Sequence, residues 1–219
     1  MPLDEKLRKC LERALDCGRA RAGSPSSLVA DARRRWARLC AWIAQGLIHP
    51  DADLDALELA TLAIQLPLRQ PLSSETGIAI RTNLRQRAEQ AAEMLLEEIP
   101  EKTDDATSIL LDRVTLLLHE LPQRRPNREE ARLLADAVNL EDFGLVGLLQ
   151  QATQIARQGG GIAQIADGLK KREAYGYWDS RLKDGFHFET IRKLAAQRLE
   201  HLRTAAALLN GELAENSGA

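Results

Sequence analysis

The chain has 219 residues, of which 44% are hydrophobic and 28% charged, with 30 basic and 32 acidic side chains and a formal net charge of -2. This composition is typical of a globular protein of one domain and excludes an intrinsically disordered or fibrous chain. The near balance of charge excludes a general electrostatic attraction to nucleic acid, so we expect no nucleic-acid partner.

The sequence lacks the features of a membrane or exported protein. No run approaches the roughly 20 apolar residues that a membrane helix requires, and the start of the chain does not have the apolar core of an export signal. The cysteines, Cys10, Cys17 and Cys40, are odd in number and lack the spacing of metal ligands. We therefore expect reduced thiols, a cytoplasmic location and no contact with a membrane.

Apolar residues recur at the spacing of amphipathic helices along most of the chain, and prolines, glycines and capping residues divide this pattern into elements. The predicted helices cover about residues 3–21, 26–47, 53–64, 77–98, 103–121, 127–143, 145–158 and 190–214, with a polar loop at 71–76. The segment from Lys170 to Trp178 is mixed and is assigned no element. No stretch has the period of two that strands show. We predict an all-α, single-domain helical bundle.

The first predicted helix has Leu3, Leu7, Leu11 and Leu15 at strict four-residue spacing. This stripe exceeds what a helix facing a core strictly needs, so it is a candidate surface for a homodimer or for a protein partner. The predicted division of the chain is an N-terminal helix with that role at 1–22, a helical domain at 23–214 and a disordered tail at 215–219.

Two local patterns predict how later helices are placed. The helix at 103–121 is apolar nearly all round, which indicates that it is the central and most buried helix. Asn127, with Glu130 three residues later, forms a capping-box pattern at the start of the following helix.

Polar and glycine-rich patterns favour structural roles over binding roles. Arg81, Arg85 and Arg87 are assigned to a solvated helix face, because Glu and Gln residues follow them and no aromatic residue lies between them. The triple glycine at 159–161 has no Lys-Ser/Thr after it, so a plain connector is favoured over a phosphate-binding loop.

Most of the few aromatic residues gather near the C-terminus. Tyr177, Trp178, Phe186 and Phe188 are interpreted as part of a C-terminal core, with a stacking pocket for a base or a peptide as the alternative.

Three segments together resemble one known family. The segment Leu134-Ala-Asp136-Ala-Val138-Asn-Leu140-Glu-Asp-Phe-Gly144-Leu-Val-Gly147 resembles the Asp-Ala-Asp-x-Leu-Asp-x-x-Gly-x-x-Gly segment of small bacterial HD-domain phosphohydrolases, and its two glycines are in register. The run 57–66 is similar to that family's Glu-Leu-Ala-Ala-Leu-Leu-His-Asp-Ile, and the residues from 177 to 198 are similar to its C-terminal helix. The resemblance covers most of residues 26–212 in the right order and implies the HD-domain fold.

The resemblance also implies where the metal ligands would be. In that family a His, an adjacent His-Asp pair and a later Asp hold a divalent metal, whose bound water attacks a phosphate ester. These positions fall on Ala32, Ile64, Gln65 and Val138, where the apolar side chains have no lone pair and an amide is a poor substitute. We therefore expect no metal, no cofactor and a catalytically inactive protein that acts as a binding, regulatory or structural module.

Some polar residues nevertheless match family positions. Gln65, His119 and Asp136 are candidates for a residual polar pocket with a small phosphorylated ligand, although His119 is as well explained as a helix-terminal residue and Asp136 as the partner of an Arg. One alternative is a metal-dependent phosphohydrolase with the atypical ligands His119, Asp136, Asp142 and Glu130. The other is a helical protein-interaction module that docks through the leucine stripe.

Overall fold

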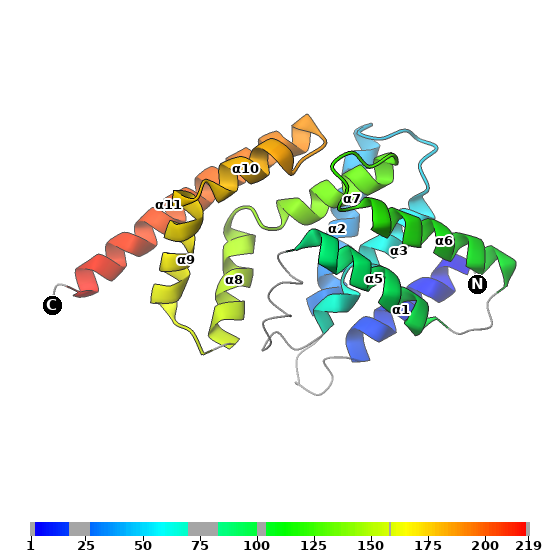
Figure 1. The fold of residues 1–219 in the computed structure, drawn as a ribbon, viewed down its shortest axis with the longest axis horizontal. Helices are drawn as coiled ribbons and strands as arrows, with labels where there is room; N and C mark the ends of the chain where they lie inside the picture. The colour runs from blue at the N-terminus through cyan, green and yellow to red at the C-terminus, as the bar shows by residue number, and fades with distance from the viewer. Residues whose placement is uncertain (1–2, 18–26, 70–82, 100–103, 158, 218–219) are drawn as a thin grey trace. The chain divides into compact units, whose positions relative to one another are not determined.

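A computed structural model describes residues 3–17, 27–69, 83–99, 104–157 and 159–217 (Figure 1). Its helices are α1 (Leu3–Cys17), α2 (Ser27–Ala44), α3 (Leu54–Ala63), the short 3-10 helix η2 (Leu66–Arg69), α5 (Leu84–Glu98), α6 (Asp105–Glu120), α7 (Glu129–Leu140), α8 (Leu145–Arg157), α9 (Ile162–Ala174), α10 (Tyr177–Asp184) and α11 (Glu189–Ser217). The all-α prediction is confirmed, since this part of the chain contains no strand. The predicted loop at 71–76 and Arg81 lie outside the described residues.

The chain divides into two compact units by its internal contacts. Unit 1 comprises Met1–Ala135 and unit 2 comprises Asp136–Ala219, so the boundary falls within α7. Among the described helices, none is long and apolar enough to cross a membrane.

Helix α3 is the centre of unit 1. Seven of its ten residues are buried, and it contacts α1, α2, α5 and α6. The prediction that the helix at 103–121 is the central one is wrong, because Ile109 and Leu116 on α6 are 59% and 41% exposed. An apolar sequence on every face therefore does not ensure that every face is covered, because covering depends on the neighbouring helices.

The leucine stripe of α1 belongs to the core of unit 1. Leu7, Leu11 and Leu15 are 6%, 0% and 0% exposed, and α1 contacts α2, α3 and α5. The side chain of Leu3 lies outside the described part. The prediction of a docking or dimerisation surface is therefore wrong for these three leucines, because α2, α3 and α5 of the same chain cover them.

Acidic side chains fix the beginnings of helices in unit 1. The Asp53 carboxylate accepts a hydrogen bond from the Ala56 amide at 3.1 Å and caps α3. The capping-box prediction for Glu130 is wrong, because its carboxylate accepts the backbone amide of Asp53 at 2.8 Å. The neighbouring Glu129 accepts the amide of His49 at 2.8 Å. Both glutamates therefore join the start of α7 to the loop between α2 and α3, which satisfies loop amides rather than those of α7.

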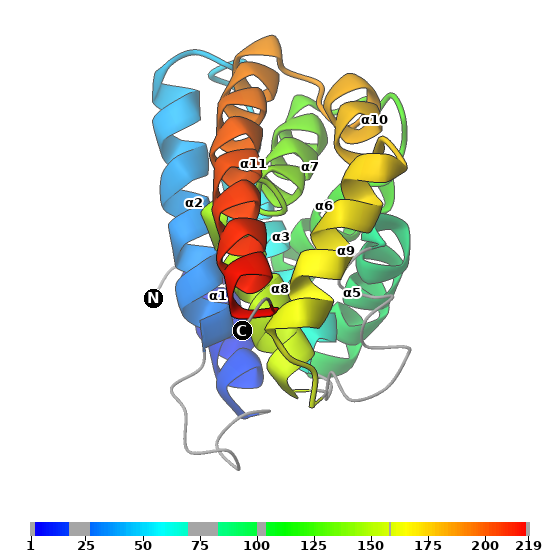
Figure 2. The ribbon, with the colours of Figure 1, turned by 90° about the vertical axis from the view of Figure 1, so that its left-hand side faces the viewer.

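Unit 2 contains α8, α9, α10 and α11, and α9 lies beside α11 (Figures 1 and 2). The segment that the sequence left without an element forms the end of α9 and the start of α10, separated by Gly176 with a φ of 61°. A left-handed residue of this kind ends one helix and redirects the chain. Helix α11 continues to Ser217, so the tail predicted from 215 begins too early.

The aromatic core that the sequence predicts is present in part in unit 2. Tyr177 and Phe188 are only partly buried, whereas Trp178 and Phe186 are 3% and 8% exposed. Phe143, which the prediction did not include, lies between them with ring centroids 5.3 Å from Trp178 and 5.4 Å from Phe186, both edge to face. This geometry is favourable for aromatic rings and fixes the turn after α7 against α10.

Candidate functional site

The positions that match the family's metal ligands are buried. In unit 1, Ala32 on α2 is 1% exposed, and Ile64 and Gln65 at the end of α3 are 0% and 2% exposed. In unit 2, Val138 on α7 is 8% exposed. Three of these four side chains are hydrocarbon, so Gln65 is the only one that presents a lone pair.

An arginine binds the backbone and side chain at Ile64 and Gln65. Arg87 of α5 donates from Nε to the carbonyl oxygen of Ile64 and from Nη2 to Oε1 of Gln65, both at 2.8 Å. Arg87 is buried, so its assignment to a solvated face is wrong, whereas Arg85 is exposed as predicted. The physical reason is that the last carbonyls of a helix lack partners within it, and Arg87 supplies a donor to the carbonyl of Ile64.

A second arginine approaches the same end of α3. Arg35, one turn after Ala32 on α2, is completely buried, and its Nη1 lies 3.5 Å from the carbonyl oxygen of Thr61. The C-terminal end of a helix dipole favours cations. Two guanidinium groups therefore lie at the C-terminal end of α3, where the helix dipole is favourable to them.

His119 and Gln65 contribute little to a polar pocket. His119 is exposed in the last turn of α6, and its backbone carbonyl accepts Nε2 of Gln123 at 3.3 Å. This position agrees with the alternative in which the imidazole is a helix-terminal residue. The amide oxygen of Gln65 is occupied by Arg87.

Asp136 holds the start of α11 within unit 2. Its buried carboxylate accepts hydrogen bonds from two backbone amides. The amide of His187 lies 2.8 Å from Oδ1 and 3.0 Å from Oδ2, and the amide of Phe188 lies 2.9 Å from Oδ2. Burial raises the pKa of Asp136 from 3.8 to about 7, although the amides of Phe188 and His187 and the charge of Arg192 act in the opposite direction. Asp136 has the structural role that the sequence favours, but its hydrogen-bond partners here are backbone amides.

The remaining residues of the alternative hydrolase site also have structural partners. Asp142 pairs with Arg181 at 3.0 Å, and Arg181 also donates to Oδ1 of Asn139 at 2.8 Å. Glu130 accepts the Asp53 amide described above. Within the described residues, no three or more His, Cys, Asp or Glu side chains gather as a group that could hold a metal.

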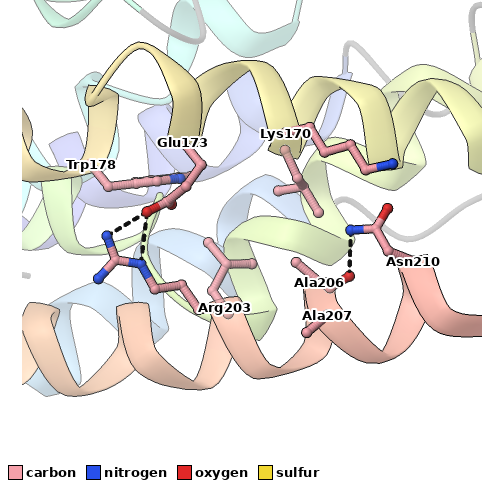
Figure 3. A pocket seen from close by; sticks show the side chains of 9 residues that line it. Lys170, Glu173, Trp178, Arg203, Ala206, Ala207 and Asn210 are labelled. Carbon is pink, nitrogen blue, oxygen red and sulfur yellow. Dashed lines mark hydrogen bonds and ion pairs between the residues drawn. The ribbon is translucent and has the colours of Figure 1, made fainter.

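A groove in unit 2 is a feature that the sequence did not predict. It lies between α9 and α11 and has a volume of about 340 Å³. Leu169, Leu202 and Trp178 give it apolar walls, and polar side chains line both ends (Figure 3). The available signal is the run of alanines at 205–207 on α11, because small side chains leave space between packed helices.

No protein-family model, curated protein or solved structure matches this chain. The resemblance to HD-domain phosphohydrolases therefore rests on the residues of the three sequence segments alone.

Proposed function

We propose that this protein is a catalytically inactive relative of the HD-domain phosphohydrolases, which holds no divalent metal and acts as a binding or regulatory module. The observation that supports the proposal most directly is the pair of hydrogen bonds from Arg87 to Ile64 and Gln65. In the family these two positions supply an imidazole and a carboxylate to the metal. Here a buried guanidinium donates to the backbone at Ile64 and to Oε1 of Gln65, so the one side-chain oxygen at these two positions already has a partner.

The chemistry of the side chains supports the same conclusion. A hydrolytic metal centre needs ligands with lone pairs and an open position for water. Ala32, Ile64 and Val138 offer no lone pair, and the amide oxygen of Gln65 already accepts a hydrogen bond. The alternative hydrolase has no supporting observation, because Asp136, Asp142 and Glu130 each bind a backbone amide or an arginine.

The proposal is tested with the full-length protein and the metals Mn, Mg and Co. After incubation with each metal and dialysis, mass spectrometry should find no stoichiometric metal, and the melting temperature should not rise with metal concentration, since only binding to the folded state raises it. Hydrolysis of nucleoside triphosphates and para-nitrophenyl phosphate should stay at the buffer rate with each metal. Stoichiometric metal together with metal-dependent turnover would overturn the proposal.

A further inference from the structure

The groove between α9 and α11 has the size and lining of a small-molecule site. Its volume of about 340 Å³ lies in the range of roughly 300–1,000 Å³ that is usual for such sites. Leu169 from α9, Leu202 from α11 and the buried indole of Trp178 form apolar walls, and Ala206 leaves the space between them. An apolar body of one or two rings fits this lining.

At one end of the groove, the charged side chains of Arg203 and Glu173 pair with each other. Arg203 donates to Glu173 from Nε at 3.0 Å and from Nη2 at 2.7 Å (Figure 3). It also donates to Glu200 at 3.0 Å and to Asp179 at 3.3 Å. Its hydrogen bond to Glu173 is the main reason that the pKa of the Arg203 guanidinium lies above its ordinary value. The charge of Arg203 is therefore already neutralised by its own unit.

The other end presents an acceptor and a cation. Asn210 donates from Nδ2 to the carbonyl oxygen of Ala206 at 2.8 Å, whereas its buried Oδ1 has no hydrogen-bond partner among the described residues (Figure 3). A buried acceptor without a donor costs about 1–3 kcal/mol, and a ligand that supplies the donor removes this cost. Lys170, which lines the same end, has no hydrogen bond or ion pair within the described part of the chain.

We propose that this groove binds a small amphipathic carboxylate. Its apolar body lies against Leu169, Leu202 and Trp178, an N–H or O–H group donates to Oδ1 of Asn210, and its carboxylate pairs with the ammonium group of Lys170. Of the three charged residues that line the groove, Glu173 and Arg203 pair with each other, whereas Lys170 has no ion pair within the described part of the chain. This favours an anionic group at the end of the groove where Lys170 lies. The proposal goes beyond the proposed function and does not depend on it, because the groove lies wholly in unit 2 and involves no metal position.

Three matched probes test the chemistry by isothermal titration calorimetry with the full chain. Para-anilinobenzoate has the rings, the N–H donor and the carboxylate, and it should bind. Para-phenoxybenzoate replaces the N–H by an ether oxygen, and diphenylamine lacks the carboxylate. Each should bind about tenfold more weakly, which corresponds to the loss of one interaction of about 1.4 kcal/mol.

Variants test the place of binding. Lys170→Met and Asn210→Leu should each weaken para-anilinobenzoate about tenfold, and Ala206→Phe should abolish binding by filling the groove. Lys171→Met is the matched control, because Lys171 is exposed, adjacent in sequence and not part of the lining. Because Lys170 is exposed, Lys170→Met should fold normally, and it therefore still tests the proposal if Ala206→Phe fails to fold.

The proposal is overturned if para-anilinobenzoate does not bind at millimolar concentration. It is also overturned if Lys170→Met binds para-anilinobenzoate as tightly as the wild type does, or if para-phenoxybenzoate binds equally well. None of these results bears on metal content or hydrolysis, so failure here is distinguishable from failure of the proposed function.

Discussion

Arg87 is buried, yet its charged group has defined partners on another helix. Its guanidinium donates to the carbonyl oxygen of Ile64 and to Oε1 of Gln65 at 2.8 Å each. Buried polar atoms without partners are costly, so the arginine and its two acceptors depend on one another. The buried position of Arg87 therefore contributes to the stability of unit 1.

Substitution of this arginine tests that dependence. Arg87→Met should lower the free energy of unfolding by about 2–4 kcal/mol, because it leaves two acceptors without this donor. The exposed neighbour Arg85→Met should change it by less than about 0.5 kcal/mol. Adding Gln65→Leu to Arg87→Met should recover part of the loss, since one of the orphaned acceptors is then removed. Urea denaturation measures all four proteins, and equal effects of the two arginine variants would contradict this account.

The raised pKa of Asp136 predicts that the stability of the protein depends on pH. The folded state holds the proton of this carboxyl up to about pH 7, whereas the unfolded chain releases it near 3.8. The folded state binds more protons within this window, so the contribution of Asp136 to the free energy of unfolding should fall as pH rises from about 4 to about 7. Each unit of pKa difference corresponds to about 1.4 kcal/mol.

The measurement compares the wild type with Asp136→Asn by urea denaturation at several pH values. The variant has no titrating group at this position, so the stability advantage of the wild type should be largest at acid pH and should shrink toward pH 7. Asp55→Asn, which changes an exposed carboxylate in the first turn of α3, should keep the wild-type pH profile. An advantage that grows with pH would mean that the ionised form of Asp136 is the stabilising one.

At the level of elements, Gly144 joins α7 to α8 where few other residues fit. Its φ is 84°, and a Cβ added to it would lie 3.1 Å from Cβ of Arg198 on α11. The left-handed conformation costs other residues about 1–2 kcal/mol, and the close contact adds to this cost. The glycine that matches the family pattern in sequence thus also has a structural reason in this chain.

Two glycine substitutions should have opposite effects. Gly144→Ala should lower the free energy of unfolding by at least about 1 kcal/mol. Gly211→Ala should raise it by about 0.5–1 kcal/mol, because Gly211 lies within α11, where alanine loses less conformational entropy and where no atom lies within 4 Å of an added Cβ. Thermal unfolding monitored by circular dichroism distinguishes the two, and a stabilising Gly144→Ala would exclude strain at the α7–α8 junction.

At the scale of the whole molecule, the leucine stripe of α1 is buried in the core of unit 1 and is not a surface for a partner. Leu11→Ala should lower the free energy of unfolding by about 2–5 kcal/mol, as is typical of a cavity at a fully buried leucine. Leu96→Ala, at a side chain that is 58% exposed, is the control and should have little effect. Light scattering should give the same particle mass for the wild type and both variants. A changed mass with unchanged stability would restore the docking interpretation of α1.

Much of the secondary structure was predictable because its signals lie within a turn or two of the element they mark. The cap at Asp53, the break at Gly144 and the apolar periodicity that places most helices are all local. The region of α9 and α10 escaped prediction because its apolar residues do not form one regular stripe: Ala166 and Leu169 are buried, whereas Ile162 is 58% exposed. The boundary at Gly176 depends on its left-handed φ of 61°.

The sequence by itself determined the helical class, most helix positions and the absence of metal-binding side chains at Ala32, Ile64 and Val138. Only the tertiary structure decided that Arg87 is buried and donates a hydrogen bond to Ile64, 23 residues away. It also decided that Asp136 accepts a hydrogen bond from the amide of His187, 51 residues away, and that a groove lies between α9 and α11. The physical reason is that helix formation follows from near neighbours in the chain. Burial, and the partners of a buried polar atom, depend on which distant segments cover each helix face.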